Sequence, residues 1–323
     1  MRRRDFVAAI GGGVATALTR PAWSAATARI GFISGDDEKA AATFVSAMRD
    51  GLAAEGYGEP DTLMLELLYA NDQLDRIPAL VANVAGRTDL IVTHAAATPV
   101  VVKAQRPVPV VYEFSADPVA TGIAADLAHP LFNATGITLL KAELNEKRLE
   151  FLHEIAPQLH RVAVVANPLH PGEETERAVL SAKAQRLGIH LDFFATPDGA
   201  ALDRAMAAIA ADPPEAIVAV SEGFIVSHRA AILDFAVTRR IPVISGWAVM
   251  AQSGALLTYG PRLVESYRRT AYFAARILKG AKPADLPIEQ PTVLDLVINL
   301  RSARALGLTI PNVLLARADE VIE

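Results

Sequence analysis

The chain has 323 residues, of which 52% are hydrophobic and 21% charged, and it contains no cysteine. This length and apolar content are enough for two well-packed α/β lobes. The lack of cysteine excludes disulfides, a thiol nucleophile, thiolate metal sites and a lipidated N-terminal cysteine. A formal net charge of −5 argues against a nucleic-acid partner.

Residues 1–26 have the organisation of an export signal. An arginine run at residues 2–4 precedes an apolar stretch at 7–18, and small residues follow at positions 22, 24 and 26. This order predicts a twin-arginine signal peptide, a mature chain that begins near Thr27, and a periplasmic location. The segment carries a net charge of +3, so its removal changes the formal net charge of the chain from −5 to −8. No segment is apolar for the roughly 20 residues that span a bilayer, so the mature chain is expected not to cross the membrane.

Apolar β-branched runs then alternate with amphipathic stretches, which is typical of parallel sheets flanked by helices. Residues 29–34 (RIGFIS) resemble residues 161–166 (RVAVVA), and the apolar strands expected at 63–69 and 189–194 follow each of them. Residues 89–93 match 215–219, and 108–111 match 241–244. Four matches displaced by about 130 residues predict two similar lobes.

A helix is expected over residues 263–278 and a strand over 293–298, after both lobes are complete. These late elements must return to the lobes, so we expect a hinge of several crossings, near residues 139–143, 254–257 and 288–292. The predicted N-terminal lobe comprises residues 27–139 with 257–287. The predicted C-terminal lobe comprises residues 140–256 with 288–323.

Several sequence words occur in an order and spacing that resemble one known family. They include YGP at 259–261, YRR at 267–269, ILKGAKPADLPIEQPT at 277–292, LVINL at 296–300 and ALGLTIP at 305–311. Earlier words agree: DPV at 117–119, GIT at 136–138, KRL at 147–149, NP at 167–168 and SHR at 227–229. From residue 28 to 323 the chain resembles the ABC-transporter substrate-binding proteins related to tryptophan- and phenylalanine-binding ones.

The resemblance implies a periplasmic-binding-protein type I fold, in which two lobes joined by a multi-strand hinge close on one small solute. It also implies a partner, the ABC permease of the inner membrane, which is powered by a cytoplasmic ATPase. We therefore expect a monomeric solute-binding protein that is not an enzyme and needs no cofactor or metal. The same fold could instead serve a sensor that reports its ligand to a membrane receptor.

Ligands of open α/β sheets bind beyond the carboxyl ends of the strands, at loops that lead into helices. That rule selects loops in both lobes of this chain, and Tyr259 is added because it is expected near a crossing. The candidate ligand-binding residues are Ser34, Gly35, Thr93, His94, Ser115, Asp117, Asn167, Ser221, Glu222, Phe224, Trp247 and Tyr259.

Hydroxyl groups at Ser34, Thr93, Ser115 and Ser221 are suited to a ligand carboxylate, although each could be a plain helix cap. The selected loops contain no lysine or arginine. Polyanionic ligands are therefore disfavoured.

The same loops hold acidic residues at Asp36, Asp117 and Glu222. An ammonium group could pair with Asp117 or Glu222. The structural alternatives are an Asx turn at Asp117 and a solvated loop acid at Glu222.

Aromatic side chains near these loops could stack on a flat apolar ligand. Trp247 is the preferred stacking residue, because it follows Gly246 on a loop at a strand end. Phe114, Phe224 and Tyr259 could equally pack within the lobes. An apolar or aromatic amino acid, or a related small aromatic acid, is therefore the expected ligand.

Residues 219–223 (AVSEG) approximate the G-x-S-x-G nucleophile elbow, which would make Ser221 the nucleophile of a hydrolase. The first glycine is missing, and residues 224–226 are expected to extend the loop rather than start a helix. His228, with Ser227 as N-cap, is expected to begin a helix instead. The histidines lack metal-binding spacing, and no phosphate-binding loop follows a strand, so no metal or nucleotide site is expected.

Overall fold

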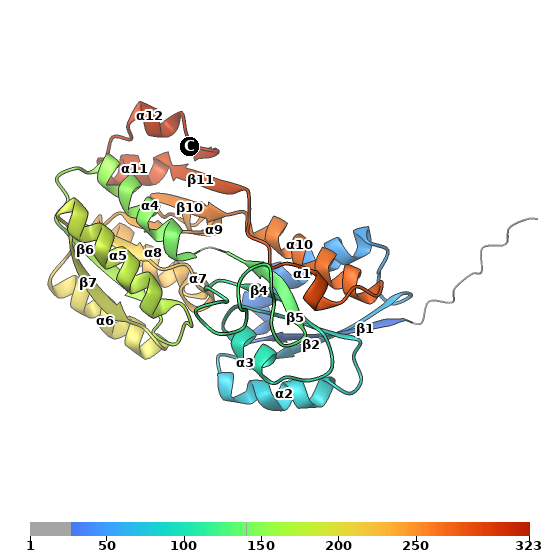
Figure 1. Ribbon diagram of the computed structural model, residues 1–323. Helices are drawn as coiled ribbons and strands as arrows, with labels where there is room; N and C mark the ends of the chain where they lie inside the picture. Colours follow the sequence, from blue (N-terminus) through green and yellow to red (C-terminus); the bar gives the residue numbers. More distant parts are fainter. Residues whose placement is uncertain (1–26, 140) are drawn as a thin grey trace, which may run out of the picture.

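The computed structural model describes residues 27–139 and 141–323 and forms two α/β lobes (Figure 1). The predicted signal peptide, residues 1–26, lies outside the described residues. The first sheet has the strand order β2-β1-β3-β4-β5 and is parallel throughout. Its strands are β1 (Ala28–Ser34), β2 (Leu63–Tyr69), β3 (Leu90–His94), β4 (Val110–Phe114) and β5 (Ala134–Thr138).

The second sheet has seven strands in the order β12-β11-β10-β9-β8-β6-β7 and contains one antiparallel pair, β10 with β11. Its strands are β6 (Arg161–Ala166), β7 (His190–Ala195), β8 (Ala216–Ala219), β9 (Val243–Ser245), β10 (Leu257–Pro261), β11 (Leu294–Asn299) and β12 (Glu320–Ile322). The order β7-β6-β8-β9-β10 repeats the order of the first sheet. The predicted internal repeat and the two-lobe α/β fold are therefore confirmed.

Helices cover both faces of each sheet, because the strands are apolar on both sides. In the first lobe α1 (Glu38–Ala54) and α10 (Leu263–Leu278) pack on one face (Figure 1), and α2 (Ile77–Val84) and α3 (Thr98–Lys103) pack on the other. In the second lobe one core includes α4 (Lys141–Ile155), α5 (Glu173–Leu187), α11 (Leu300–Leu306) and α12 (Asn312–Leu315). The opposite core includes α6 (Gly199–Ala211), α7 (Gly223–Ser227), α8 (Arg229–Arg239) and α9 (Ala248–Gln252).

Helix α10 returns to the first lobe from the second and packs closely on α1. Gly51 of α1 makes this approach possible, because a Cβ at that position would lie 2.7 Å from the Cβ of Ala271 in α10. The helix was predicted over residues 263–278, and the structure has the same bounds. Its apolar face buries Phe273 and Ala274 in the first-lobe core, which explains why the chain recrosses.

The position of the second crossing differs from the prediction. Residues 257–261 were assigned to the first lobe, but they form β10, which pairs with β9 and β11 in the second sheet. The chain therefore crosses at Arg262, not at 254–257. The first crossing joins β5 to α4, and the third lies between η3 (Pro283–Asp285) and β11. Before that crossing, Glu289 exchanges backbone hydrogen bonds with Gly136 and Thr138 beside β5.

Candidate functional site

The loops at the carboxyl ends of the two sheets meet between the lobes. Ser115, directly after β4, lies 2.8 Å (Oγ to Nε2) from His170 in the loop after β6. A Cβ on Gly172 would lie 2.9 Å from the Cβ of Ala116, and a Cβ on Gly223 would lie 2.8 Å from Oδ1 of Asp36. The lobes therefore touch at residues that follow β1 and β4 on one side and β6 and β8 on the other.

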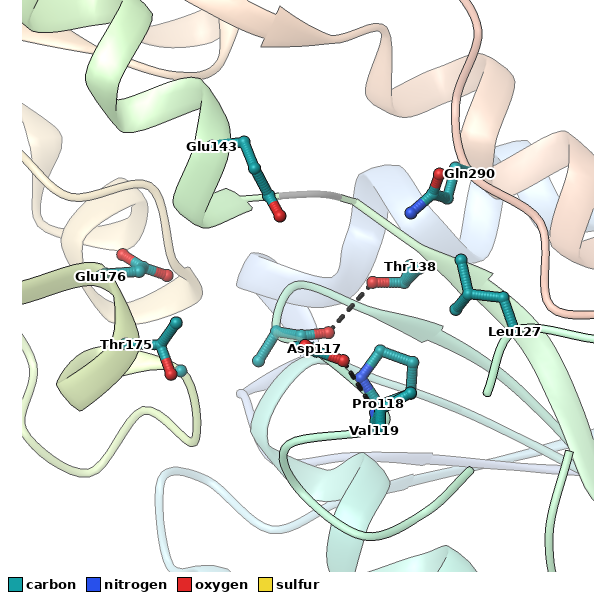
Figure 2. Close-up of a pocket in the computed structure, with 11 residues that line it drawn as sticks. Asp117, Pro118, Val119, Leu127, Thr138, Glu143, Thr175, Glu176 and Gln290 are labelled. Carbon is teal, nitrogen blue, oxygen red and sulfur yellow. Dashed lines mark hydrogen bonds between the residues drawn. The ribbon is translucent and has the colours of Figure 1, made fainter. Parts of the chain in front are cut away.

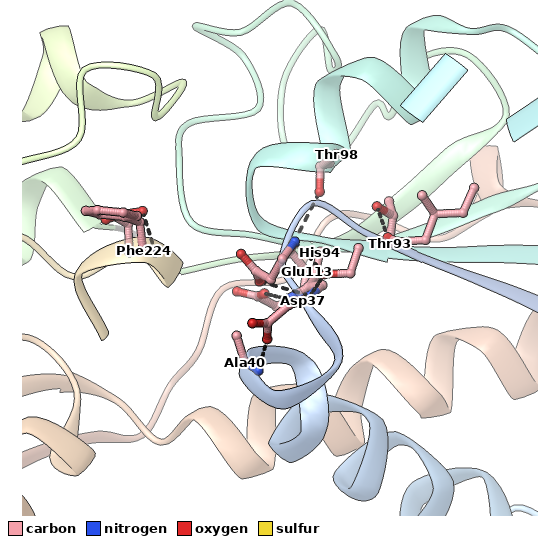
Figure 3. Close-up of polar contacts among 11 residues, drawn as sticks. Asp37, Ala40, Thr93, His94, Thr98, Glu113 and Phe224 are labelled. Carbon is pink, nitrogen blue, oxygen red and sulfur yellow. Dashed lines mark hydrogen bonds and ion pairs between the residues drawn. The ribbon is translucent and has the colours of Figure 1, made fainter. Parts of the chain in front are cut away.

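A buried polar cluster occupies the carboxyl edge of the first sheet (Figure 3). Nε2 of His94 lies 2.9 Å from Ser34 Oγ and 3.5 Å from Asp36 Oδ2, and Nδ1 lies 4.0 Å from Glu113 Oε2. Burial lowers the pKa of His94 to about 4. Burial, and secondarily the charge of Asp37, raises the pKa of Asp36 to about 6. At neutral pH the cluster therefore holds a neutral imidazole and an ionised Asp36.

Two other predicted first-lobe residues have local structural roles. The Thr93 hydroxyl is buried and donates to the carbonyl of Ile33 at 2.8 Å. A Cβ on Gly35 would lie 3.1 Å from Leu74, so a larger residue would crowd that side chain. Both residues support the turn after β1.

Asp117 forms the Asx turn that was one of its two predicted roles. Its Oδ1 accepts a hydrogen bond from the Val119 N–H at 2.8 Å, and the residue is exposed. Asn167 in the second lobe makes the same kind of turn, accepting from Leu169 N–H at 2.9 Å. Such turns leave the second oxygen of the Asp117 carboxylate available to a ligand.

In the second lobe, Glu222 caps helix α7. Its carboxylate accepts from the N–H groups of Phe224 at 3.0 Å and Ile225 at 2.6 Å, and the side chain is buried. Two local predictions are therefore wrong. Residues 224–226 do not extend the loop, and Ser227 ends α7 with its hydroxyl donating to the Phe224 carbonyl at 2.8 Å rather than capping α8.

The predicted aromatic residues lie in three different environments. Phe224 packs in the second-lobe core with its ring 4.1 Å from that of His228. Tyr259 packs edge-on against Phe151 at 5.2 Å, also within the second lobe. Trp247 comes from the second-lobe loop after β9, yet it packs against the core of the first lobe. Of these three aromatic residues, Trp247 is therefore the one that contacts the other lobe.

Arg148 in α4 is a buried cation that lies outside the strand-end loops. It is 1% exposed, its Nε donates to the Tyr259 carbonyl at 2.7 Å, and its Nη1 donates to Asn145 Oδ1. The Arg148 guanidinium and the Ser221 hydroxyl both pack against the backbone of Gly246. A Cβ at position 246 would lie 2.2 Å from Nη2 of Arg148 and 2.1 Å from Oγ of Ser221, so only glycine leaves room for them. Burial lowers the pKa of Arg148 to about 10, so it stays protonated at neutral pH.

A chain of polar contacts connects Arg148 to the inter-lobe contact. Asn145 donates from Nδ2 to Glu176 Oε2 at 3.3 Å, and Glu176 Oε1 lies 3.9 Å from Nδ1 of His170. His170 then reaches Ser115 in the first lobe. Arg148 and His170 could not be selected from the sequence, because an arginine in an amphipathic helix and a histidine in a loop are usually solvated.

A pocket of about 200 Å³ lies between the lobes, beside the crossings (Figure 2). Apolar contacts come from Pro118, Val119 and Leu127 of the first lobe. Its polar lining comes from Asp117, Thr138, Glu143, Thr175, Glu176 and Gln290. Of the candidates chosen from the sequence, only Asp117 is among the described residues that line it. A pocket closed by both lobes and by two crossings can hold one small solute.

The surroundings of Ser221 differ from those of a hydrolase nucleophile. Ser221 Oγ lies 3.5 Å from Ser245 Oγ, and within the described ranges no imidazole is hydrogen-bonded to it. The part of the chain that the structure describes contains no His, Asp and Glu group suited to a metal ion. Within that same part, no helix combines the length and apolar character needed to cross a membrane.

Comparisons with known proteins agree with this architecture. A structure from Vibrio cholerae, described as a conserved domain protein, is 27% identical with a TM-score of 0.84 and covers 92% of this chain and 100% of its own. The ABC domain of Streptococcus pneumoniae in complex with L-Trp is 23% identical, with the same TM-score and coverage. A Thermotoga lettingae 5-methylthioribose transporter solute-binding protein is 17% identical, with a TM-score of 0.64, covering 90% and 96%.

No curated protein matches the chain in sequence. The family model described as ABC transporter substrate binding protein matches residues 28–322, nearly all of the chain after the predicted signal. This family consists of substrate-binding proteins rather than enzymes. The chain therefore belongs to the ABC transporter substrate-binding protein family.

Proposed function

We propose that this protein is the periplasmic solute-binding component of an ABC importer, and that its solute is an apolar or aromatic amino acid or a related small aromatic acid. The observation that carries the proposal is the pocket of about 200 Å³ between the lobes, which is bounded by two crossings. Movement at the crossings would open it, and closing would bury one small solute. Binding energy would favour the closed form that the permease recognises.

The lining of the pocket supports a zwitterion with an apolar side chain. Asp117, Glu143 and Glu176 would favour an ammonium group, and Thr138, Thr175 and Gln290 offer hydrogen bonds to a carboxylate. Glu222 is less suitable than Asp117 for the ammonium, because both of its oxygens cap α7. The similar Streptococcus structure with L-Trp supports an aromatic amino acid.

Thermal unfolding of residues 27–323 against amino acids, aromatic acids, sugars and polyanions tests the ligand. A solute at 100 times its dissociation constant adds about 2.7 kcal/mol, which corresponds to a shift in Tm of about 4 °C for a chain of this length. Asp117→Asn keeps an oxygen for the turn to Val119 but removes the charge. We expect the variant to lose most of the shift with amino acids and to keep the shift with acids that lack an ammonium. Shifts with sugars or polyanions alone would contradict the proposal.

The importer role has its own test. Proteoliposomes that carry the cognate permease and ATPase should take up the identified solute only when the protein is present. Tight binding without uptake would favour the sensor role instead.

The export route is tested by replacing Arg3 and Arg4 with lysine, which should keep the precursor in the cytoplasm if the twin-arginine pathway carries it.

A further inference from the structure

The closed position of the lobes depends on a few contacts that cross between them. Besides Trp247, they include the Ser115–His170 hydrogen bond, the contact of Ala116 with Gly172 and the contact of Asp36 with Gly223. We call these last three the inter-lobe contacts. We propose that the inter-lobe contacts set how far the cleft closes, and that glycine at positions 172 and 223 is required for closure. The inference rests on the proposed function, because closure matters for a protein that encloses a solute.

The hydrogen bond between the lobes has a defined direction. The Gly172 N–H donates to Nδ1 of His170 at 3.1 Å, so Nδ1 carries a lone pair. The proton of the neutral imidazole is therefore on Nε2, which donates to Ser115 Oγ at 2.8 Å. Both side chains are buried. His170 is thus a positioning residue: one ring nitrogen holds its own loop, and the other holds the first lobe.

The contact at Gly172 is a rigid steric limit on closure. A Cβ at this position would lie 2.9 Å from the Cβ of Ala116, closer than Cβ atoms approach in proteins. Ala116 cannot relieve the clash by rotating, because its side chain is a single methyl group. The backbone of Gly172 has φ −97° and ψ 0°, which alanine adopts without strain. Gly172→Ala would therefore act by separating the lobes.

The contact at Gly223 faces a different element of the first lobe. A Cβ there would lie 2.8 Å from Oδ1 and 3.3 Å from Cγ of Asp36. The Asp36 carboxylate is held beside His94 at 3.5 Å and is largely covered, so it has little room to turn away. The two glycines thus limit the approach of the second lobe at the ends of β4 and β1, respectively.

Residues 27–323 contain one tryptophan, Trp247, whose side chain packs against the core of the first lobe and is 8% exposed. Separation of the lobes would expose this ring to water. The fluorescence emission of Trp247 would then shift to longer wavelength, and acrylamide would quench it more strongly. Both quantities therefore report closure in a chain that keeps Gly172 and Gly223.

Gly172→Ala and Gly223→Ala should each shift the emission to longer wavelength and raise the acrylamide quenching constant about twofold or more, because each opens the close packing around Trp247. Gly86→Ala should change neither quantity. Gly86 is a matched control, because no atom lies within 4 Å of a Cβ built there. Ser115→Ala should also raise the quenching constant, because it removes the hydrogen bond to His170, and it provides a second test if a glycine variant does not fold.

Emission and quenching in the folded Gly172→Ala and Gly223→Ala variants that equal those of Gly86→Ala would overturn the proposal. An unchanged quenching constant with Ser115→Ala would overturn the role of His170. The assay needs no solute, so its failure is distinct from a failure to find the ligand. Once a solute such as L-tryptophan shows binding, Gly172→Ala should weaken it at least tenfold.

Discussion

Asp36→Asn is expected to stabilise the protein at neutral pH and to lose that advantage in acid. Asp36 is a carboxylate whose side chain is 15% exposed, near the neutral His94. Burial, assisted by the charge of Asp37, raises its pKa from 3.8 to about 6. The raised pKa means that the fold disfavours the ionised form. Asparagine has a similar shape and carries no charge.

The magnitude follows from the difference between the two pKa values. One unit corresponds to 1.36 kcal/mol, so a shift from 3.8 to about 6 corresponds to about 3 kcal/mol. Between about pH 4 and pH 6 the folded state binds more protons at Asp36 than the unfolded state does. The free energy of unfolding therefore decreases as the pH rises through this window, and the full cost of about 3 kcal/mol is present above pH 6.

Urea unfolding of the wild type and Asp36→Asn at about pH 4 and pH 7.5 measures this effect. His94 contributes with the opposite sign, because its lowered pKa of about 4 reduces stability as the pH falls from 6.5. Both chains contain His94, so its contribution largely cancels. Asp61→Asn, at an exposed residue, is the control. If Asp36→Asn changed the free energy of unfolding by the same amount at both pH values, the argument would be refuted. Such a result would mean that the Asp36 carboxylate is as well hydrated in the folded state as in the unfolded state.

Three further substitutions test the packing. Arg148→Met is expected to cost about 3–5 kcal/mol in urea unfolding, because it leaves the buried partners of the guanidinium unpaired; a cost below about 1 kcal/mol would contradict that network. Gly51→Ala should cost about 1–3 kcal/mol because of the clash with Ala271, whereas Gly86→Ala should change stability by less than about 0.5 kcal/mol. Asp198→Ala should cost about 1 kcal/mol by removing the cap of α6, and an unchanged Tm would argue against that cap.

Local sequence patterns predicted the strands and the repeat well. The runs at residues 63–69 and 161–166 have the bounds of β2 and β6, and the other matched strands differ by one to three residues at their ends. Alternation of apolar strands and amphipathic helices is a local property, so it can be read without knowing the fold. The pairing order of the two sheets follows from the repeat, because each lobe uses the same unit.

The lobe boundary depended on information outside the local pattern. Residues 257–261 are apolar and strand-like in either lobe, so the sequence could not assign β10. The structure places β10 in the second sheet because it pairs with β9 and with the antiparallel β11, which comes from beyond α10. Strand pairing over such sequence separations is decided by the tertiary arrangement.

By itself the sequence determined the α/β class and the twofold use of one unit, because these depend on periodicity and chain order. Only the tertiary structure decided which polar groups face each other. It engages Glu222 in a helix cap, buries Arg148 beneath Gly246, and brings His170 against Ser115 across the lobes. The reason is physical: burial and partner distance control the charge and hydrogen bonding of a side chain, and both arise from residues far apart in sequence.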